Sequence, residues 1–211
     1  MCTAYQIGPN ANRFPSMVKS TLMETLRLSG ETRIIRPTLS APVLLPDGTA
    51  QEMSWGFRRK LAGKKGPVSR TIVNTRVDKL ETAMWREAFH ERRCLIPAIS
   101  FYEWVGGSGG QAVPLRFTQE DDNWILIAGI WEQGTNSPCF SMLTTEPSAC
   151  VQGVHDRMPA VLTDEQLDPY LQGTLREFLP SHVPLRHVPA ANFLKLPKPS
   201  PSARDQPTLF E

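Results

Sequence analysis

Short segments of β-branched and aromatic residues, separated by turn sequences, dominate this chain of 211 residues. They cover residues 33–45, 68–73, 101–105, 112–118, 124–131 and 139–145. Helical spacing is confined to residues 16–28, 78–92 and a short stretch at 163–171. Most successive strands therefore lack the connecting helix that a doubly wound parallel sheet requires. The sequence predicts an α+β fold with a mostly antiparallel, curled or barrel-like β-sheet and a few flanking helices.

The composition is that of an ordinary globular protein, with 40% hydrophobic and 21% charged residues. The chain is long enough to bury a sizeable core, and we expect one domain over residues 1–196. Residues 197–211 are rich in proline and poor in large apolar residues, which predicts a disordered tail. The net charge is only +2, so a nucleic-acid partner would have to be bound by a local basic patch.

The cysteines Cys2, Cys94, Cys139 and Cys150 show no CxxC spacing, and no histidine cluster accompanies them. Neither a zinc site nor a disulfide framework is indicated, and we expect no metal or organic cofactor. No signal peptide and no long apolar run is present, so the sequence predicts a soluble protein without a membrane partner. We also expect it to be a monomer. We expect it in the cytoplasm, and associated with the nucleoid if it binds DNA. Cys94, Cys139 and Cys150 are assigned to packing.

One basic stretch stands out against the low net charge. Residues 53–77 contain no acidic residue, and Trp55 and Phe57 stand near the start of this stretch. Its cations are Arg58, Arg59, Lys60, Lys64, Lys65, Arg70 and Arg76. Clustered cations with interleaved aromatic residues are suited to following a phosphate backbone while bases stack on the rings. A solvated basic loop is the alternative interpretation.

Cys2 follows Met1 directly, so removal of one residue would expose an amine and a thiol on neighbouring carbons. Such an aminothiol reacts with aldehydes: the amine forms an imine, and the thiol closes onto it as a thiazolidine ring. A cysteine at this position can equally be an ordinary N-terminal residue. Other motifs in the chain decide between these interpretations.

Several short motifs stand out along the chain. After Cys2 and Trp55-Gly56 come Asn74-Thr75-Arg76, Arg93-Cys94-Leu95-Ile96-Pro97-Ala98, Phe101-Tyr102-Glu103-Trp104, Thr144-Thr145-Glu146 and His155-Asp156-Arg157-Met158-Pro159. Over residues 1–190 this arrangement resembles the SOS-response-associated peptidase (SRAP) family, whose members crosslink covalently to abasic sites in single-stranded DNA. The chain departs from the family pattern at Thr3, Ala4 and Ser100, and Phe57-Arg58-Arg59 follows Trp55-Gly56 without the usual Pro and second Trp.

The resemblance implies a catalytic group formed by Cys2, Asn74, Glu103 and His155. An abasic deoxyribose is mostly a closed ring, and a histidine that titrates near neutral pH is suited to moving the proton that opens it. Glu103 would hold the α-ammonium, take its proton and stabilise the iminium ion. Asn74 would orient the amine or a sugar hydroxyl. His90, His182 and His187 receive no role.

DNA contacts are the second set of predicted residues, drawn from these motifs and from the basic stretch. Arg76 and Arg157 offer planar forks for phosphates, and Trp55 would stack on a base or belong to the core. The full predicted set is Trp55, Arg58, Arg59, Arg76, Thr144, Thr145 and Arg157.

The predicted function is therefore covalent capture of abasic sites in single-stranded DNA through a thiazolidine at Cys2. A cellular aminopeptidase or the protein itself would remove Met1. One alternative is a cysteine peptidase or amidohydrolase with Cys2 as nucleophile and His155 as base. Another is a noncovalent binder of single strands that uses only the basic stretch.

The C-terminal tail carries a further motif. Gln206-Pro207-Thr208-Leu209-Phe210 combines a polar residue with an apolar Leu-Phe pair on an extended tether. It resembles the pentapeptide with which bacterial replication and repair proteins bind the sliding clamp, with Gln206, Leu209 and Phe210 as anchors. A terminus without function is the alternative.

Overall fold

The structure, a computed structural model, describes residues 2–8, 32–106, 112–178 and 182–193. The helical elements are η1 (Val77–Lys79), α2 (Arg86–Glu91), α3 (Ala149–Gln152) and α4 (Asp164–Leu171). The strands are β1 (Ala4–Ile7), β2 (Arg33–Ile35), β3 (Ser40–Leu44), β4 (Ala50–Trp55), β5 (Phe57–Leu61), β6 (Val68–Ile72), β7 (Asn74–Arg76), β8 (Arg93–Ala98), β9 (Ser100–Val105), β10 (Val113–Gln119), β11 (Ile125–Gln133), β12 (Pro138–Thr145), β13 (Met158–Pro159) and β14 (Leu185–Pro189).

A small closed barrel forms the centre of the molecule. Its strands follow the order β11-β8-β3-β4-β12, and pairing of β11 with β12 closes the ring. Every residue of β8 is buried, as are the first six of β11, which is typical of strands covered on both faces. β7 and β13 extend β12 beyond the ring. The parallel pairing of β12 with β4 and β7 is the exception in a mostly antiparallel fold.

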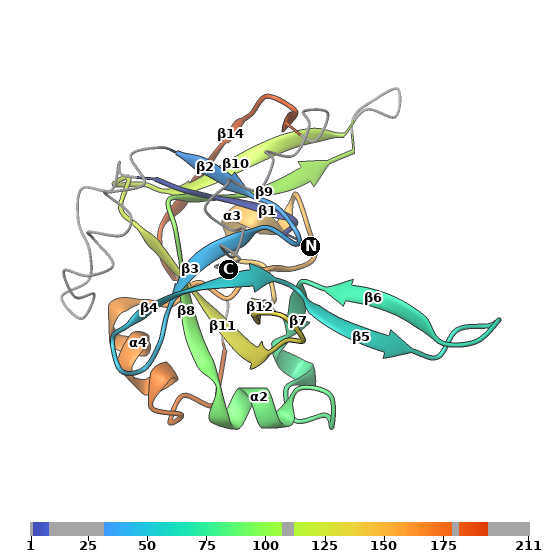
Figure 1. The fold of residues 1–211 in the computed structure, drawn as a ribbon. Helices are drawn as coiled ribbons and strands as arrows, with labels where there is room; N and C mark the ends of the chain where they lie inside the picture. Colours follow the sequence, from blue (N-terminus) through green and yellow to red (C-terminus); the bar gives the residue numbers. More distant parts are fainter. Residues whose placement is uncertain (1, 9–31, 107–111, 179–181, 194–211) are drawn as a thin grey trace, which may run out of the picture.

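A second sheet of five strands, ordered β14-β10-β9-β1-β2, packs over the barrel (Figure 1). The first strand of the chain lies inside this sheet, paired with β9 on one side and β2 on the other. The register pairs Ala4 with Tyr102 and Tyr5 with Phe101. The N-terminal segment is therefore fixed along the motif that contains Glu103.

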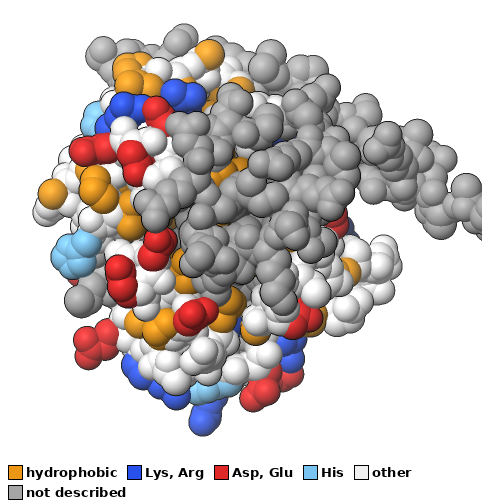
Figure 2. Space-filling view, turned by 90° about the vertical axis from the view of Figure 1, so that its left-hand side faces the viewer, with side chains coloured by type: hydrophobic (Ala, Val, Ile, Leu, Met, Phe, Trp, Pro, Cys, Tyr) orange, Lys and Arg blue, Asp and Glu red, His pale blue; other side chains and the backbone are white. Residues whose placement is uncertain are grey.

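Strands β5 and β6 form an antiparallel hairpin that projects from the body of the molecule (Figure 1). It contains most of the basic stretch. Arg58, Lys60 and Arg70 are exposed on its strands, and Lys64 and Lys65 are exposed at its turn. On the face turned away from this hairpin, the visible described residues include charges of both signs interspersed among neutral side chains (Figure 2). The hairpin therefore concentrates positive charge on one projection of the protein.

The predicted α+β class with a mostly antiparallel, barrel-like sheet is confirmed. The predicted strand at 33–45 is divided into β2 and β3, because the chain turns at Pro37 and Thr38 and moves from one sheet to the other. Thr38 has a φ of 73°, a left-handed conformation that no strand contains. The predicted short helix at 163–171 is confirmed as α4, with Thr163 and Gln166 forming a capping box.

The predicted helix at 78–92 is wrong, since this segment contains η1, a series of turns and the short helix α2. Leu80 and Trp85 are both buried. These two residues are five positions apart in the sequence. On a continuous helix their side chains would point about 140° apart, so one helix could not turn both toward the core. The predicted helix at 16–28 and the C-terminal tail lie outside the described residues. No helix in the described part of the chain is long and apolar enough to span a membrane.

Trp55 lies completely inside the core, which corrects its predicted role in stacking on a base. Its ring contacts Tyr5 edge-on at a centroid distance of 5.2 Å and stacks with Phe140 at 6.3 Å. Its indole nitrogen donates a hydrogen bond of 2.8 Å to the carbonyl oxygen of Val73. With 0% of its surface exposed and its one donor used, Trp55 joins β4 to its neighbours and offers no ring face to DNA.

Candidate active site

Cys2 lies two residues before the start of β1, and both its carbonyl oxygen and its thiol form hydrogen bonds. The amide nitrogen Nδ2 of Asn74 donates a hydrogen bond of 2.6 Å to the Cys2 carbonyl oxygen. The thiol donates to the carbonyl oxygen of Ala4 at 3.2 Å. Asn74 is the first residue of β7, so its contact with Cys2 joins the strand added to the barrel to the start of the second sheet. In the chain that retains Met1, Cys2 is fully buried.

Glu103 is a carboxylate buried at this site. It follows Tyr102 on β9, and because Tyr102 pairs with Ala4, Glu103 stands beside the residues that precede β1. Burial raises the pKa of Glu103 to about 7, although the positive charge of the amino terminus opposes this rise. Burial, followed by the negative charge of Glu103, raises the pKa of the Cys2 thiol well above its usual value. The site therefore pairs a neutral thiol with a carboxyl group that titrates near neutral pH.

His155 lies in the loop after α3, three-quarters buried. Its Nδ1 atom accepts a hydrogen bond of 3.0 Å from the Arg157 backbone amide and lies 2.8 Å from Oδ1 of Asp156. Burial, followed by the positive charge of the amino terminus, lowers the pKa of His155. At neutral pH the neutral ring therefore predominates, and it can accept a proton.

Strand pairing places Asn74, Arg76 and Thr144 together. The parallel register of β7 and β12 pairs Met142 with Asn74 and Thr144 with Arg76, so these four side chains share one face. The Asn74 side-chain oxygen and the Thr144 hydroxyl are buried and have no hydrogen-bond partner among the described residues. Unsatisfied buried polar atoms are costly in a structural role, which favours a role in binding a ligand here.

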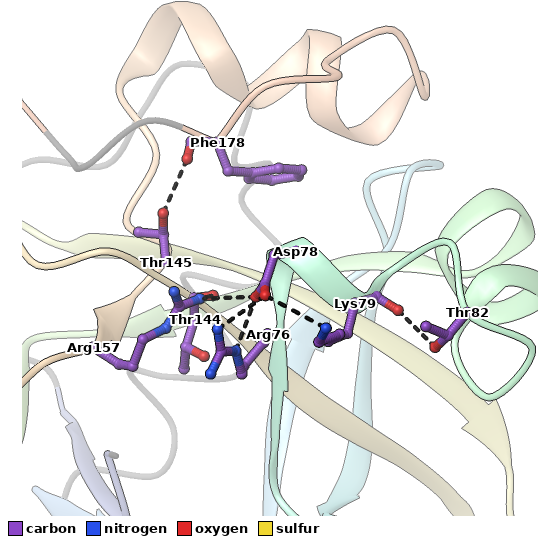
Figure 3. A network of polar contacts seen from close by, with 8 residues as sticks. All are labelled: Arg76, Asp78, Lys79, Thr82, Thr144, Thr145, Arg157 and Phe178. Carbon is purple, nitrogen blue, oxygen red and sulfur yellow. Dashed lines mark hydrogen bonds and ion pairs between the residues drawn. The ribbon is translucent and has the colours of Figure 1, made fainter.

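A network of ionic contacts adjoins this face (Figure 3). Arg76 binds both carboxylate oxygens of Asp78, through Nε and Nη2, at 2.9 Å each. Arg157 extends from the loop before β13, donates to the Thr144 carbonyl oxygen and lies 3.8 Å from Asp78. The two arginines come from different parts of the chain and meet around one carboxylate. Sequence analysis missed Asp78, although its position two residues after Arg76 was a signal for it.

Two other predicted DNA contacts have structural partners instead. Arg59 forms a bidentate ion pair with Glu132 at 2.6 Å, and its guanidinium lies over the rings of Phe57 and Trp85. Thr145 is buried and donates a hydrogen bond of 2.9 Å to the Phe178 carbonyl oxygen (Figure 3). We therefore correct the assignment of both residues. Their partners are distant in the sequence, so no local pattern indicated them.

The described residues contain no group of three or more His, Cys, Asp or Glu side chains arranged to hold a metal ion. Cys94 and Cys139 are buried, in agreement with their assignment to packing. What the residues above assemble is an N-terminal cysteine, a carboxyl group, a histidine and an amide, with arginines beside them. This arrangement is suited to proton transfer and nucleophilic chemistry near an anionic ligand.

Comparison with known proteins identifies the family to which this fold and site belong. The family model of the SOS response associated peptidase (SRAP) matches residues 1–192, and the chain belongs to this family. "Abasic site processing protein YoqW" of Bacillus subtilis is 29% identical over 163 residues, covering 68% of this chain and 72% of that protein. "Abasic site processing protein HMCES" of Rattus norvegicus is 27% identical over 176 residues, 62% of this chain and 50% of that protein.

Solved structures share the fold at low sequence identity. A protein from Bacteroides thetaiotaomicron superimposes with a TM-score of 0.67 at 18% identity, covering 90% of this chain and 93% of that one. A protein from Bordetella bronchiseptica gives a TM-score of 0.65 at 21% identity, covering 90% of this chain and all of the other. These likenesses concern the fold alone.

Proposed function

We propose that this protein captures abasic sites in single-stranded DNA by forming a thiazolidine with the α-amine and thiol of Cys2 after loss of Met1. The observation that carries the proposal is the fixed position of Cys2 between the Asn74 amide and the buried Glu103 carboxyl group. Related proteins from Bacillus subtilis and rat are named abasic site processing proteins, which supports the choice of substrate.

The reaction begins with opening of the sugar ring. Neutral His155 takes the proton of the hemiacetal hydroxyl, and the ring oxygen receives a proton as the aldehyde forms. The Cys2 amine then attacks the aldehyde carbon, and loss of water gives an iminium ion. The thiol adds to that carbon, forming the C–S bond, while its proton leaves and the nitrogen lone pair is restored. Glu103, with a pKa of about 7, can accept and return the protons of these steps.

DNA would lie along the face that carries Arg76, Thr144 and Arg157. The arginines would supply phosphate contacts, and the Thr144 hydroxyl, which has no hydrogen-bond partner among the described residues, would bind a sugar or phosphate oxygen. The exposed cations of the β5–β6 hairpin, including Arg58, would add contacts to more distant phosphates. Because these contacts do not read bases, we expect little dependence on the sequence around the abasic site.

The test is a denaturing gel of the purified protein mixed with single strands that carry one abasic site. The intact protein should give a shifted band that survives heating, whereas Cys2→Ala and an undamaged strand should give none. An equally abundant band from Cys2→Ala would reject the role of the thiol. Turnover of a peptide by the intact protein, without any band on damaged DNA, would favour the peptidase alternative instead.

We also propose that the tail binds the bacterial sliding clamp through Gln206, Leu209 and Phe210. Deleting residues 206–211 should abolish capture of the purified clamp in a pull-down assay and leave crosslinking to abasic DNA unchanged. Substituting Leu209 and Phe210 with alanine tests the same contact without shortening the chain. Undiminished clamp binding by both variants would show that the motif has no such role.

A further inference from the structure

Three cations from separate positions surround the carboxylate of Asp78 (Figure 3). Arg76 contacts both oxygens at 2.9 Å, Arg157 lies 3.8 Å from Oδ1, and the Lys79 ammonium lies 4.0 Å from Oδ2. The Arg76 hydrogen bonds lower the pKa of Asp78, so the group is charged at neutral pH. One negative charge thus occupies a position at which three positive charges converge.

This position has the properties of a phosphate site. A planar guanidinium that binds two oxygens of a carboxylate can bind two oxygens of a phosphate in the same way. The Arg157 side chain is only 9% exposed, and its Nε atom has no hydrogen-bond partner within the described residues. Asp78 therefore leaves a hydrogen-bond donor of Arg157 unused. A phosphate, with more oxygens and a larger negative potential, is better suited to this set of donors.

The Asp78 side chain is 44% exposed and belongs to η1, a single 3-10 turn at the surface. Ion pairs at such exposed positions contribute little net stability, so a polyanion can displace the carboxylate at small cost. Arg157, in contrast, is held by the Thr144 carbonyl oxygen and does not depend on Asp78 for its position.

We propose that Asp78 is an internal counterion that occupies a DNA-phosphate site formed by Arg76 and Arg157 and lowers the affinity of the protein for undamaged single strands. This inference rests on the proposed function, since it assumes that the site binds DNA. A bound phosphate would replace the carboxylate on Arg76, and Asp78 would turn into solvent. Competition of this kind weakens all noncovalent binding equally, while a covalent bond at Cys2 still retains a strand that carries an abasic site. Asp78 thereby makes retention of DNA by the protein more selective for strands that carry an abasic site.

The experiment measures binding of a fluorescent undamaged single strand by anisotropy at several salt concentrations. Asp78→Asn should bind about fivefold more tightly than the unmodified protein. The plot of log affinity against log salt should become steeper by about 0.7, because the displaced Asp78 carboxylate of the unmodified protein takes up a counterion and so offsets the release from one phosphate contact. Asp78→Ala should give the same result. Asp168→Asn, an exposed substitution on α4 with the same change in net charge, serves as the matched control and should change affinity far less.

Unchanged or weaker binding by Asp78→Asn and Asp78→Ala, with melting temperatures equal to that of the unmodified protein, would overturn the inference. Weaker binding would mean that Asp78 positions the arginines instead of competing with DNA. Equal tightening by Asp168→Asn would also overturn it, because the effect would then be one of net charge. Failure of the proposed function is distinguishable, since it would appear as absence of crosslinking in the unmodified protein.

Discussion

Glu103→Gln should slow covalent capture of abasic DNA by at least about a hundredfold, the usual contribution of a general acid or base. Glutamine retains the shape of the side chain and its hydrogen-bonding ability, but it cannot accept the protons of the amine and thiol. The rate of appearance of the crosslinked band, measured at pH 7.5, tests this. Glu91→Gln, an exposed substitution in α2, is the matched control and should react at the unmodified rate. A Glu103→Gln variant with the unmodified rate would exclude Glu103 from the chemistry.

The same substitution should stabilise the protein above neutral pH. The pKa of Glu103 rises from 4.5 to about 7 on folding, so between these values the folded state holds a proton that the unfolded state has lost. Stability therefore falls as the pH rises through this range, and above pH 7 the full cost of the buried charge is present. Glutamine avoids this cost.

The expected gain for Glu103→Gln is on the order of 2 to 3 kcal/mol at pH 8 and close to zero at pH 4. Urea unfolding at the two pH values measures it. A variant less stable than the unmodified protein at pH 8 would mean that the ionised carboxylate is stabilised by its surroundings. A site that lowers stability while it promotes reaction is typical of functional residues.

Trp55→Ala should destabilise the fold by about 3 to 5 kcal/mol, the usual effect of deleting a large buried aromatic side chain. The loss comprises the stacking on Phe140, the contact with Tyr5 and the hydrogen bond to Val73. Trp55→Phe retains an aromatic ring without the hydrogen bond and should cost less. Chemical denaturation gives both values. Unmodified stability together with weakened DNA binding would instead support the stacking role that the sequence suggested.

The positions of most strands could be predicted from the sequence, because turn signals and runs of β-branched residues are local features. Barrel closure could not be predicted, since it depends on β3 pairing with β8 and on β4 pairing with β12, contacts between strands that are distant in the sequence. For the same reason the sequence did not indicate the pairing of β1 with β9, which brings Glu103 beside Cys2.

The site residues divide in a similar way. Motifs identified which side chains to consider, but their availability depends on distant partners. Trp55 and Arg59 looked suited to DNA from their types alone, and the structure gives them Phe140 and Glu132 as neighbours. Asp78 was overlooked because an acidic residue does not resemble a DNA contact, yet it lies between two arginines that do.

The central claim is that the amine and thiol of Cys2 together form the bond to DNA. Intact mass spectrometry of the crosslinked product, prepared from a mixture of chains that retain or lack Met1, tests it most directly. We predict that the product contains only chains that begin at Cys2, with the mass of chain plus strand minus one water. A stable adduct on chains that still carry Met1 would contradict the claim, because their Cys2 nitrogen is an amide and cannot form an imine.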